Sequence, residues 1–241
     1  SLQFARYLPV VVDQVARVIV RVQPALAGLL ASLDARLNIV TTDELVPPHD
    51  CHCPIMSLPW VLGVERIDPS GPYLFPDTTK AARWATELGR RLRPRVGLVW
   101  TGLQSGLVDV TSDMALSDLL PLAAYDADWF ALMPEVPARD AGFVQPFGLH
   151  CVEGRLADMA ETAALIANLD LVISVDTAVA HLAGALGKPC WLMLRYSSEW
   201  RWGRSRSDSA WYTSMRIFRQ TRAGDWRSVV TAIQSAIEEL R

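Results

Sequence analysis

The sequence predicts an α/β protein with parallel sheets, on three observations. Short apolar runs typical of buried strands alternate with segments of helical periodicity along most of the 241 residues. The runs at 96–100, 171–175 and 190–194 are nearly all apolar, as in strands covered on both faces. The pattern also changes near Arg93–Arg95, where a proline-rich region gives way to regular alternation. We therefore expect two Rossmann-like halves joined by a basic linker.

In the first half, each element follows from a local pattern. Residues 2–12 carry apolar side chains at helical spacing, and Pro9 must kink or divide that helix. Residues 47–76 are rich in proline and should be mostly loop. The arginine-rich end of the segment 80–92 suits the negative end of a helix dipole. The expected helices are 2–12, 25–33 and 80–92, and the expected strands are 16–22 and 37–41.

The second half alternates more regularly between strand and helix patterns. A polar loop follows the strand that ends at Trp100, and the segment 156–169 shows a clear apolar stripe at helical spacing. A closing helix is expected at the C-terminal end. The expected strands are 96–100, 129–133, 171–175, 190–194 and 213–218, and the expected helices are 116–124, 156–169, 178–186 and 226–240.

Composition excludes several classes of protein. With 23 basic and 26 acidic residues, the net charge of −3 argues against a general nucleic-acid binder. Four cysteines are too few for a disulfide scaffold in a chain of this size. No apolar run is long enough to span a membrane, and no signal peptide is visible, so a cytoplasmic protein is expected. The segment His49–Cys53 has metal-ligand residue types, but sequence neighbours cannot all point at one ion, so no metal is expected.

The strongest local signal is Leu171-Val-Ile-Ser-Val-Asp-Thr-Ala-Val-Ala-His-Leu-Ala-Gly-Ala-Leu-Gly-Lys-Pro189. It predicts a buried strand, a two-residue turn and a small-residue helix whose first N–H groups can hold a phosphate. Asp176 or Thr177 can cap this helix, and His181 lies one turn in, near a bound phosphate or sugar. The alternative is that Asp176 is only a cap and His181 a hydrogen-bonded, half-buried residue.

This segment resembles the Asp-Thr/Ser-x-x-x-His-Leu-Ala-x-Ala-Leu-Gly-x-Pro signature of glycosyltransferase family 9, the ADP-heptose:lipopolysaccharide heptosyltransferase group. It is still more similar to a related domain at the C-terminus of many bacterial tetratricopeptide-repeat proteins. That resemblance covers nearly the whole chain, through the segments 2–9, 50–54, 57–59, 96–100, 170–191, 199–202, 209–212, 215–220 and 224–226.

The resemblance implies a GT-B fold. Residues 1–94 would form an acceptor-side half that lacks its first strand, and residues 95–241 the half that binds a nucleotide sugar. The implied activity is metal-independent and needs no cofactor: a sugar moves from a nucleotide-diphosphate donor, expected to be ADP-linked, to a glycan or protein acceptor. A tetratricopeptide-repeat partner or fused segment is also implied.

The same resemblance assigns candidate site residues. The donor diphosphate and sugar should be lined by Asp176, Thr177, Ala178 and His181. The acceptor side should be faced by Asp50 and His52, and we add Trp100 and Arg201 as further substrate-binding candidates. Two roles are open for the tryptophans of the closing segments, which either stack on a base or pack the halves together: Trp200, Trp202, Trp211 and Trp226.

Three departures from the family pattern keep a second hypothesis open. The expected aspartate base would precede Ser1, the segment 101–112 contains no cationic residue, and Pro134–Pro137 replaces a Gln-Lys-Gly-like segment. A departing diphosphate needs positive charge, which could come from Arg195, Arg201, Arg204 or Arg206. The alternative function is a catalytically degenerate domain that serves as a ligand-binding or protein-interaction scaffold.

Overall fold

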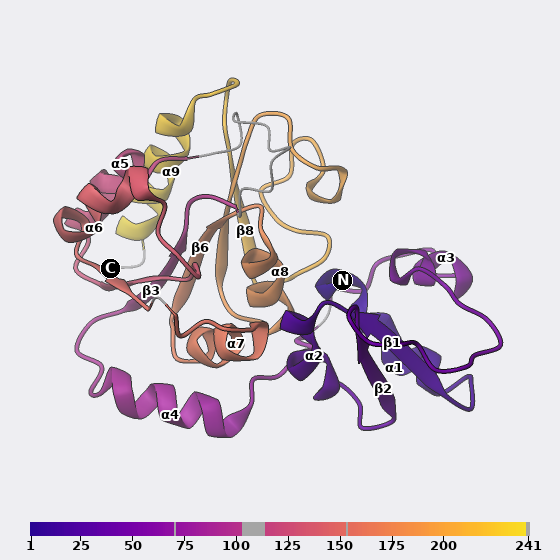
Figure 1. Ribbon diagram of the computed structural model, residues 1–241. Coiled ribbons are helices and arrows are strands. Elements are labelled where there is room, and N and C mark those ends of the chain that lie inside the picture. The colour runs from indigo at the N-terminus through magenta and orange to yellow at the C-terminus, as the bar shows by residue number, and fades with distance from the viewer. Residues whose placement is uncertain (70, 103–113, 153, 240–241) are drawn as a thin grey trace.

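A six-stranded parallel sheet forms the centre of the C-terminal part (Figure 1). The computed structural model describes residues 1–69, 71–102, 114–152 and 154–239. The strand order is β5-β4-β3-β6-β7-β8, and every neighbouring pair is parallel. These strands are β3 (Arg95–Val99), β4 (Asp128–Ala131), β5 (Leu149–Cys151), β6 (Leu171–Val175), β7 (Cys190–Leu194) and β8 (Met215–Arg219). The predicted α/β class is confirmed.

Helices pack in two groups around this sheet (Figure 1). One group joins α5 (Leu116–Leu119), the 3-10 turn η4 (Leu120–Ala124), α6 (Ala141–Phe147) and α9 (Trp226–Glu238). The other joins α7 (Met159–Ala167) and α8 (Ala178–Ala185), with α4 (Thr78–Leu88) and α2 (Pro24–Ala31) packed on α7. Two further 3-10 turns are η5 (Ala138–Asp140) and η6 (Trp200–Trp202). Because both faces are covered, all residues of β3, β6 and β7 are buried.

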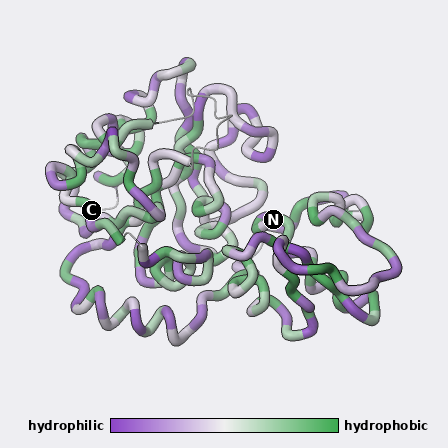
Figure 2. Tube along the Cα trace, in the orientation of Figure 1, coloured by the Kyte–Doolittle hydropathy of each residue, from purple (hydrophilic) through white to green (hydrophobic). Residues whose placement is uncertain are grey.

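The N-terminal part is built on a smaller parallel sheet of two strands. β1 (Val18–Val22) pairs with β2 (Leu37–Thr41), with Val18 opposite Leu37. This confirms the expectation of two parallel-sheet parts of which the first is less complete. One continuous hydrophobic core runs through both parts, and Figure 2 shows hydrophobic stretches in each. The remaining N-terminal elements are η1 (Leu2–Tyr7), α1 (Leu8–Val12), η2 (Ile55–Ser57) and α3 (Leu58–Val61).

The first turn of the chain, η1, packs against α8 of the C-terminal part. The Arg6 guanidinium donates to the carbonyl oxygens of Asp68 and Trp211, each at 2.7 Å, and lies 4.6 Å from the centre of the Tyr73 ring. The Tyr73 hydroxyl donates to the Leu2 carbonyl at 3.0 Å. These contacts hold η1 beside α8. The division of the chain into two domains, residues 1–94 and 95–241, stays a prediction.

Two helices have bounds that differ from the predicted ones because capping residues set their ends. The helix expected over 80–92 is Thr78–Leu88, because the Asp77 carboxylate accepts from the Lys80 amide at 2.9 Å and the chain turns at Gly89 with a φ of 63°. The arginines of 90–95 lie beyond the helix in sequence, but the Arg95 guanidinium donates to the carbonyl oxygens of Leu88 at 2.9 Å and Gly89 at 2.8 Å, so a positive charge lies at the C-terminal end of the helix as predicted. The helix expected over 156–169 is Met159–Ala167, because Asp158 caps it.

The structure also bears on the predicted N-terminal helix and contains two elements that were not predicted. The expected helix over 2–12 is divided between Tyr7 and Leu8 into η1 and α1, and Pro9 lies in the first turn of α1. The elements α6 and β5 were not predicted. No helix in the described ranges combines the length and apolar character that crossing a membrane requires.

Candidate functional site

The candidate site lies where the strand order of the large sheet reverses. β3 and β6 are parallel neighbours, with Val99 opposite Ser174. After β3 the chain adds β4 and β5 on one side of the sheet, and it then returns to add β6, β7 and β8 on the other side of β3. Open α/β sheets bind ligands at this switch point, outside the carboxyl ends of the strands. Asp176 and Thr177 follow β6 directly and so belong to this position.

Helix α8 begins at this point, as predicted. Thr177 is its N-cap residue, in extended conformation, and its side chain makes no cap hydrogen bond with any described residue. Its hydroxyl instead lies 3.1 Å from the Ser174 hydroxyl. Among the described residues, the N–H groups of Ala178 and Val179 therefore have no side-chain cap, whereas that of Ala180 donates to the Thr177 carbonyl at 3.1 Å, and the two free donors favour an anion there.

Of the two residues expected as possible caps of α8, Thr177 occupies the N-cap position and Asp176 does not. Oδ2 of Asp176 accepts a hydrogen bond from the indole N–H of Trp202 at 2.8 Å. Its Oδ1 lies 4.0 Å from Nε2 of His181, and the side chain is 27% exposed. Burial raises the pKa of Asp176 above its usual value, and the Trp202 N–H and the charge of Arg201 act against that rise.

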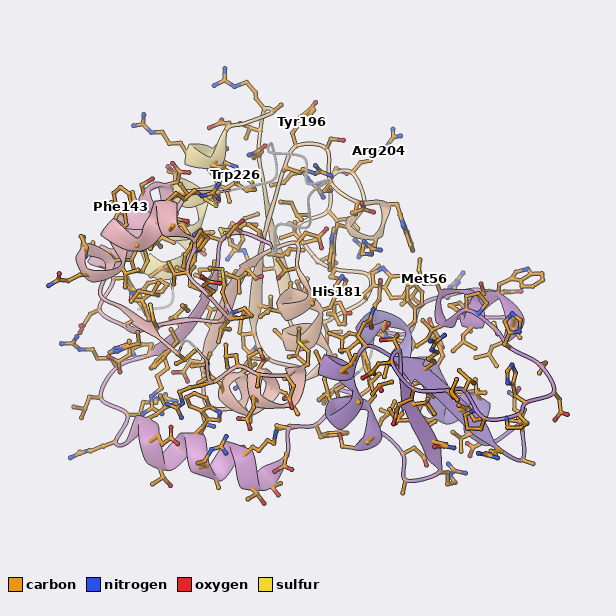
Figure 3. The ribbon with its side chains drawn as sticks, viewed as in Figure 1. Met56, Phe143, His181, Tyr196, Arg204 and Trp226 are labelled. Atoms are coloured by element: carbon orange, nitrogen blue, oxygen red, sulfur yellow. The ribbon has the colours of Figure 1, made fainter. Side chains whose placement is uncertain are left out.

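His181 is held by two aromatic residues. Its Nδ1 lies 3.0 Å from the Tyr212 hydroxyl, and its ring stacks on Trp202 with 5.1 Å between centroids. Burial, helped by the positive charge of Arg201, lowers the pKa of His181 to about 3. The imidazole is therefore neutral at pH 7 and cannot bring a positive charge to a phosphate. Figure 3 labels it on α8, where the two parts of the chain meet.

Arg201 brings positive charge to Asp176 and His181. Its Nε donates to Oε1 of Gln3 at 3.2 Å, and its Nη1 lies 3.5 Å from a carboxylate oxygen of Glu199. Of the other arginines considered from the sequence, Arg195 also acts on the Asp176 carboxylate, Arg206 pairs with Asp208 at 2.9 Å, and Arg204 is exposed.

Three predicted site residues do not join this group. Asp50 and His52 are exposed in the loop before η2, and no hydrogen bond within the described ranges connects them to α8. Trp100 is wholly buried at the end of β3, where its indole N–H donates to Oδ2 of Asp140 at 2.8 Å. Most of the loop expected to lack cations, 103–112, lies outside the described residues.

Several residues of the site carried no assigned role in the sequence analysis. Gln3 and Tyr212 fall within segments that resemble family 9-related domains, but their side-chain partners are distant in sequence. Four tryptophans were expected either to stack on a base or to pack within the protein. Trp202, Trp211 and Trp226 are buried, as the packing role requires, whereas Trp200 is 63% exposed.

Asp140 was also missed, and it supports the strand ends at the switch point. The carboxylate is 1% exposed and accepts from the Trp100 indole on one oxygen and from the Leu116 backbone N–H, at 3.0 Å, on the other. It therefore ties the chain after β3 to the start of α5. Arg139 lies 3.6 Å from it and supplies the compensating charge.

Replacing Asp140 with Ala is expected to lower the free energy of unfolding by about 2 kcal/mol, because it leaves two buried N–H donors without acceptors. Asp140→Asn is the matched control: its amide oxygen can still accept one of the two bonds, so about half the loss is expected. Urea titration of the three proteins measures both effects. An Asp140→Ala protein as stable as the parent would show that the two hydrogen bonds to this carboxylate do not stabilise the fold.

The family model described as Glycosyltransferase family 9 (heptosyltransferase) matches residues 151–226, a range that contains β6, α8 and η6. Protein FlbA of Caulobacter vibrioides (strain ATCC 19089 / CIP 103742 / CB 15) is 26% identical over 186 residues, which is 73% of this chain. The chain spans 30% of the length of that curated relative.

Three solved structures have a similar fold. The E. coli ADP-heptose lps heptosyltransferase II aligns with a TM-score of 0.59 at 10% identity, over 99% of this chain and 95% of its own. The iron-containing dodecameric glycosyltransferase TibC from enterotoxigenic E. coli H10407 aligns with a TM-score of 0.56 at 14% identity, over 98% and 71%. The glycosyl transferase family 9 protein of Veillonella parvula DSM 2008 gives 0.52 at 14%, over 77% and 58%.

The fold and the position of the site define the class as an α/β protein of GT-B-like architecture. Within this class, residues 151–226 match the model of glycosyltransferase family 9. The predicted resemblance to that family is confirmed over these residues, whereas the resemblance to tetratricopeptide-repeat proteins stays a prediction.

Proposed function

We propose that this chain is the sugar-transferring unit of a family 9-type glycosyltransferase. It takes a sugar from a nucleotide-diphosphate donor, with ADP as the expected nucleotide, and passes it to a glycan or protein acceptor. Residues 95–241 hold the donor and residues 1–94 face the acceptor. The observation that carries this proposal is the first turn of α8, which has no side-chain cap from a described residue and begins at the switch point of the sheet.

The donor diphosphate is proposed to sit on the first turn of α8. The Thr177 hydroxyl and the N–H groups that begin at Ala178 supply hydrogen-bond donors, and the helix dipole favours a negative charge there. Arg201 contributes the nearby positive charge. Together these groups stabilise the diphosphate as it departs, the step for which a metal-independent transfer most needs preorganised donors.

The transferred sugar is proposed to meet Asp176 and His181. The 4.0 Å between Asp176 Oδ1 and His181 Nε2 lets one hydroxyl hydrogen-bond to both. A neutral histidine beside a carboxylate suits a hydroxyl and not a phosphate, which the carboxylate repels. Asp50 and His52 remain acceptor-side candidates, and Trp100 is proposed only to support the end of β3.

Calorimetric titration separates the two subsites. Thr177→Val keeps the shape of the side chain and removes its hydroxyl, so we expect ADP to bind about three to ten times more weakly, as loss of one hydrogen bond implies. Asp176→Asn can still accept from Trp202, and it should leave ADP affinity nearly unchanged while an ADP-linked hexose or heptose loses its additional affinity. Thr213→Val, an exposed threonine outside the site, is the matched control.

Two results would contradict the proposal. If neither ADP nor UDP binds the parent chain, α8 is not a nucleotide site. If ADP binds but no ADP-linked sugar is hydrolysed or transferred by the full-length protein, the chain is a degenerate, ligand-binding scaffold.

A further inference from the structure

A hydrogen-bonded series of side chains connects the candidate site with the first turn of the chain. Nδ1 of His181 lies 3.0 Å from the Tyr212 hydroxyl. The Tyr212 hydroxyl hydrogen-bonds with the Tyr73 hydroxyl, which donates to the Leu2 carbonyl at 3.0 Å. The series therefore begins at the imidazole on α8 and ends at the backbone of η1.

The backbone end of this series fixes the direction of every proton in it. A carbonyl oxygen only accepts, so the single hydroxyl proton of Tyr73 points to Leu2 and is not available to Tyr212. Tyr212 must then be the donor in its hydrogen bond with Tyr73, and its single proton is used there. Nδ1 of His181 consequently meets an oxygen with no proton to give, so Nδ1 carries the N–H itself.

Both tyrosines are held against α8. The backbone N–H of Tyr73 donates to the Ala185 carbonyl at 3.0 Å. The buried ring of Tyr212 rests on Gly184, where an added Cβ would lie 2.4 Å from its Cγ. Since these two contacts and His181 belong to the same helix, the hydroxyl groups meet the imidazole in one geometry.

We propose that Tyr73 is a positioning residue for His181: acting through Tyr212, it keeps the imidazole proton on Nδ1 and leaves Nε2 as a hydrogen-bond acceptor beside Asp176. A neutral imidazole carries one N–H, so a proton on Nδ1 leaves a lone pair on Nε2. If Tyr212 donated to Nδ1 instead, the two tyrosine oxygens would face each other with no proton between them. Losing a hydrogen bond between half-buried and buried groups makes that arrangement the less stable one.

The series leaves two acceptors side by side at its open end. The Nε2 lone pair of His181 faces Oδ1 of Asp176 across 4.0 Å, and the other carboxylate oxygen already accepts from Trp202. Two neighbouring acceptors repel each other until a donor lies between them. The side chains of His181 and Asp176 are 15% and 27% exposed, so this end of the series is the one that a ligand reaches.

The consequence for the ligand rests on the proposed function and deepens it. A single hydroxyl between the two acceptors has to share its one proton, whereas two adjacent hydroxyls give each acceptor a hydrogen bond of its own. A diphosphate offers acceptors only and is repelled. The pair formed by Asp176 and His181 therefore selects a donor sugar that carries two adjacent free hydroxyls, and Tyr73 acts on that choice without touching the sugar.

The experiment is nitrogen NMR of 15N-histidine-labelled protein at pH 7 without ligand, with His181→Gln to identify the His181 signals among the four histidines. The parent chain is expected to show a protonated Nδ1 and an unprotonated Nε2. In Tyr73→Phe, the Tyr212 hydroxyl loses its acceptor and turns to Nδ1, so the imidazole proton should move to Nε2, where it faces the carboxylate. Tyr212→Phe, which removes the connecting hydroxyl, should give the same tautomer as Tyr73→Phe.

Tyr7→Phe is the matched control, because the buried Tyr7 hydroxyl has no hydrogen-bond partner among the described residues. It should keep the tautomer of the parent. Since Tyr73 transmits its effect through another side chain, a purely structural role would leave the position of the imidazole proton unchanged. A parent chain with the proton on Nε2, or a folded Tyr73→Phe or Tyr212→Phe chain with the proton still on Nδ1, would overturn the proposal.

A binding measurement links the tautomer to recognition of the sugar. In Tyr73→Phe, Nε2 of His181 no longer accepts from a hydroxyl, so ADP-heptose should bind about three to ten times more weakly while ADP binds as before. If the tautomer changes as expected but neither ADP nor ADP-heptose binds the parent, the proposed function fails and the role of Tyr73 stands. If ADP-heptose binds the parent and Tyr73→Phe equally, the tautomer has no part in recognition.

Discussion

Replacing Gly184 with Ala is expected to lower the free energy of unfolding by about 3 kcal/mol, the upper part of the usual range for overpacking a core. The added Cβ would lie 2.4 Å from Cγ and 2.6 Å from Cδ1 of Tyr212. These atoms form the base of a buried aromatic ring that also holds His181, so the ring cannot move without breaking that hydrogen bond. Urea denaturation followed by tryptophan fluorescence measures the loss.

A matched glycine makes this prediction specific. Gly142 lies in α6, and a Cβ there would point into open space within the described structure. Gly142→Ala should therefore be neutral or stabilising by up to about 1 kcal/mol, since alanine favours a helix over glycine. A Gly184→Ala protein as stable as Gly142→Ala would mean that Tyr212 does not rest on α8.

Acid is expected to destabilise the protein at a pH where carboxylates are still ionised. The pKa of His181 is about 3 in the folded chain against an ordinary 6.5. As the pH falls below 6.5, the unfolded chain takes up a proton at this histidine and the folded chain does not. The stability that His181 contributes is therefore complete above pH 6.5 and decreases as the pH falls toward 3. At about 1.4 kcal/mol per pH unit, the loss reaches about 2 kcal/mol at pH 5.

Comparison with His181→Gln isolates this effect. Glutamine stays neutral, so the variant should lose little stability between pH 7 and pH 5, whereas His52→Gln, at an exposed histidine, should follow the parent. Asp176 acts in the opposite direction, since its raised pKa makes the folded chain the better proton acceptor as the pH falls. Parallel stability curves for the parent and His181→Gln would contradict the neutral, buried histidine.

The most regular elements were predictable because their signals are local. The strands at 37–41, 171–175 and 190–194 have the predicted bounds. In the last two, a nearly continuous apolar run between polar turns is typical of a covered parallel strand. The elements α6 and β5 gave no such signal. Gly142 and Pro146 weaken the helical pattern of α6, and two of the three residues of β5 are exposed.

The sequence by itself determined the two parallel sheets and the start of α8 beside Asp176 and Thr177. Strands and small-residue helices can be recognised from residues that are close together in the sequence. Only the tertiary structure decided the partners of the site. Asp176 meets Trp202 across 26 positions, His181 meets Tyr212 across 31, and Arg201 meets Gln3 across 198. These contacts depend on how β7, η6 and η1 pack around α8, and no local pattern specifies that packing. For the same reason the sequence left open whether Asp176 or Thr177 caps α8: in the folded chain Thr177 is the N-cap residue, and the Asp176 carboxylate accepts from the Trp202 indole N–H.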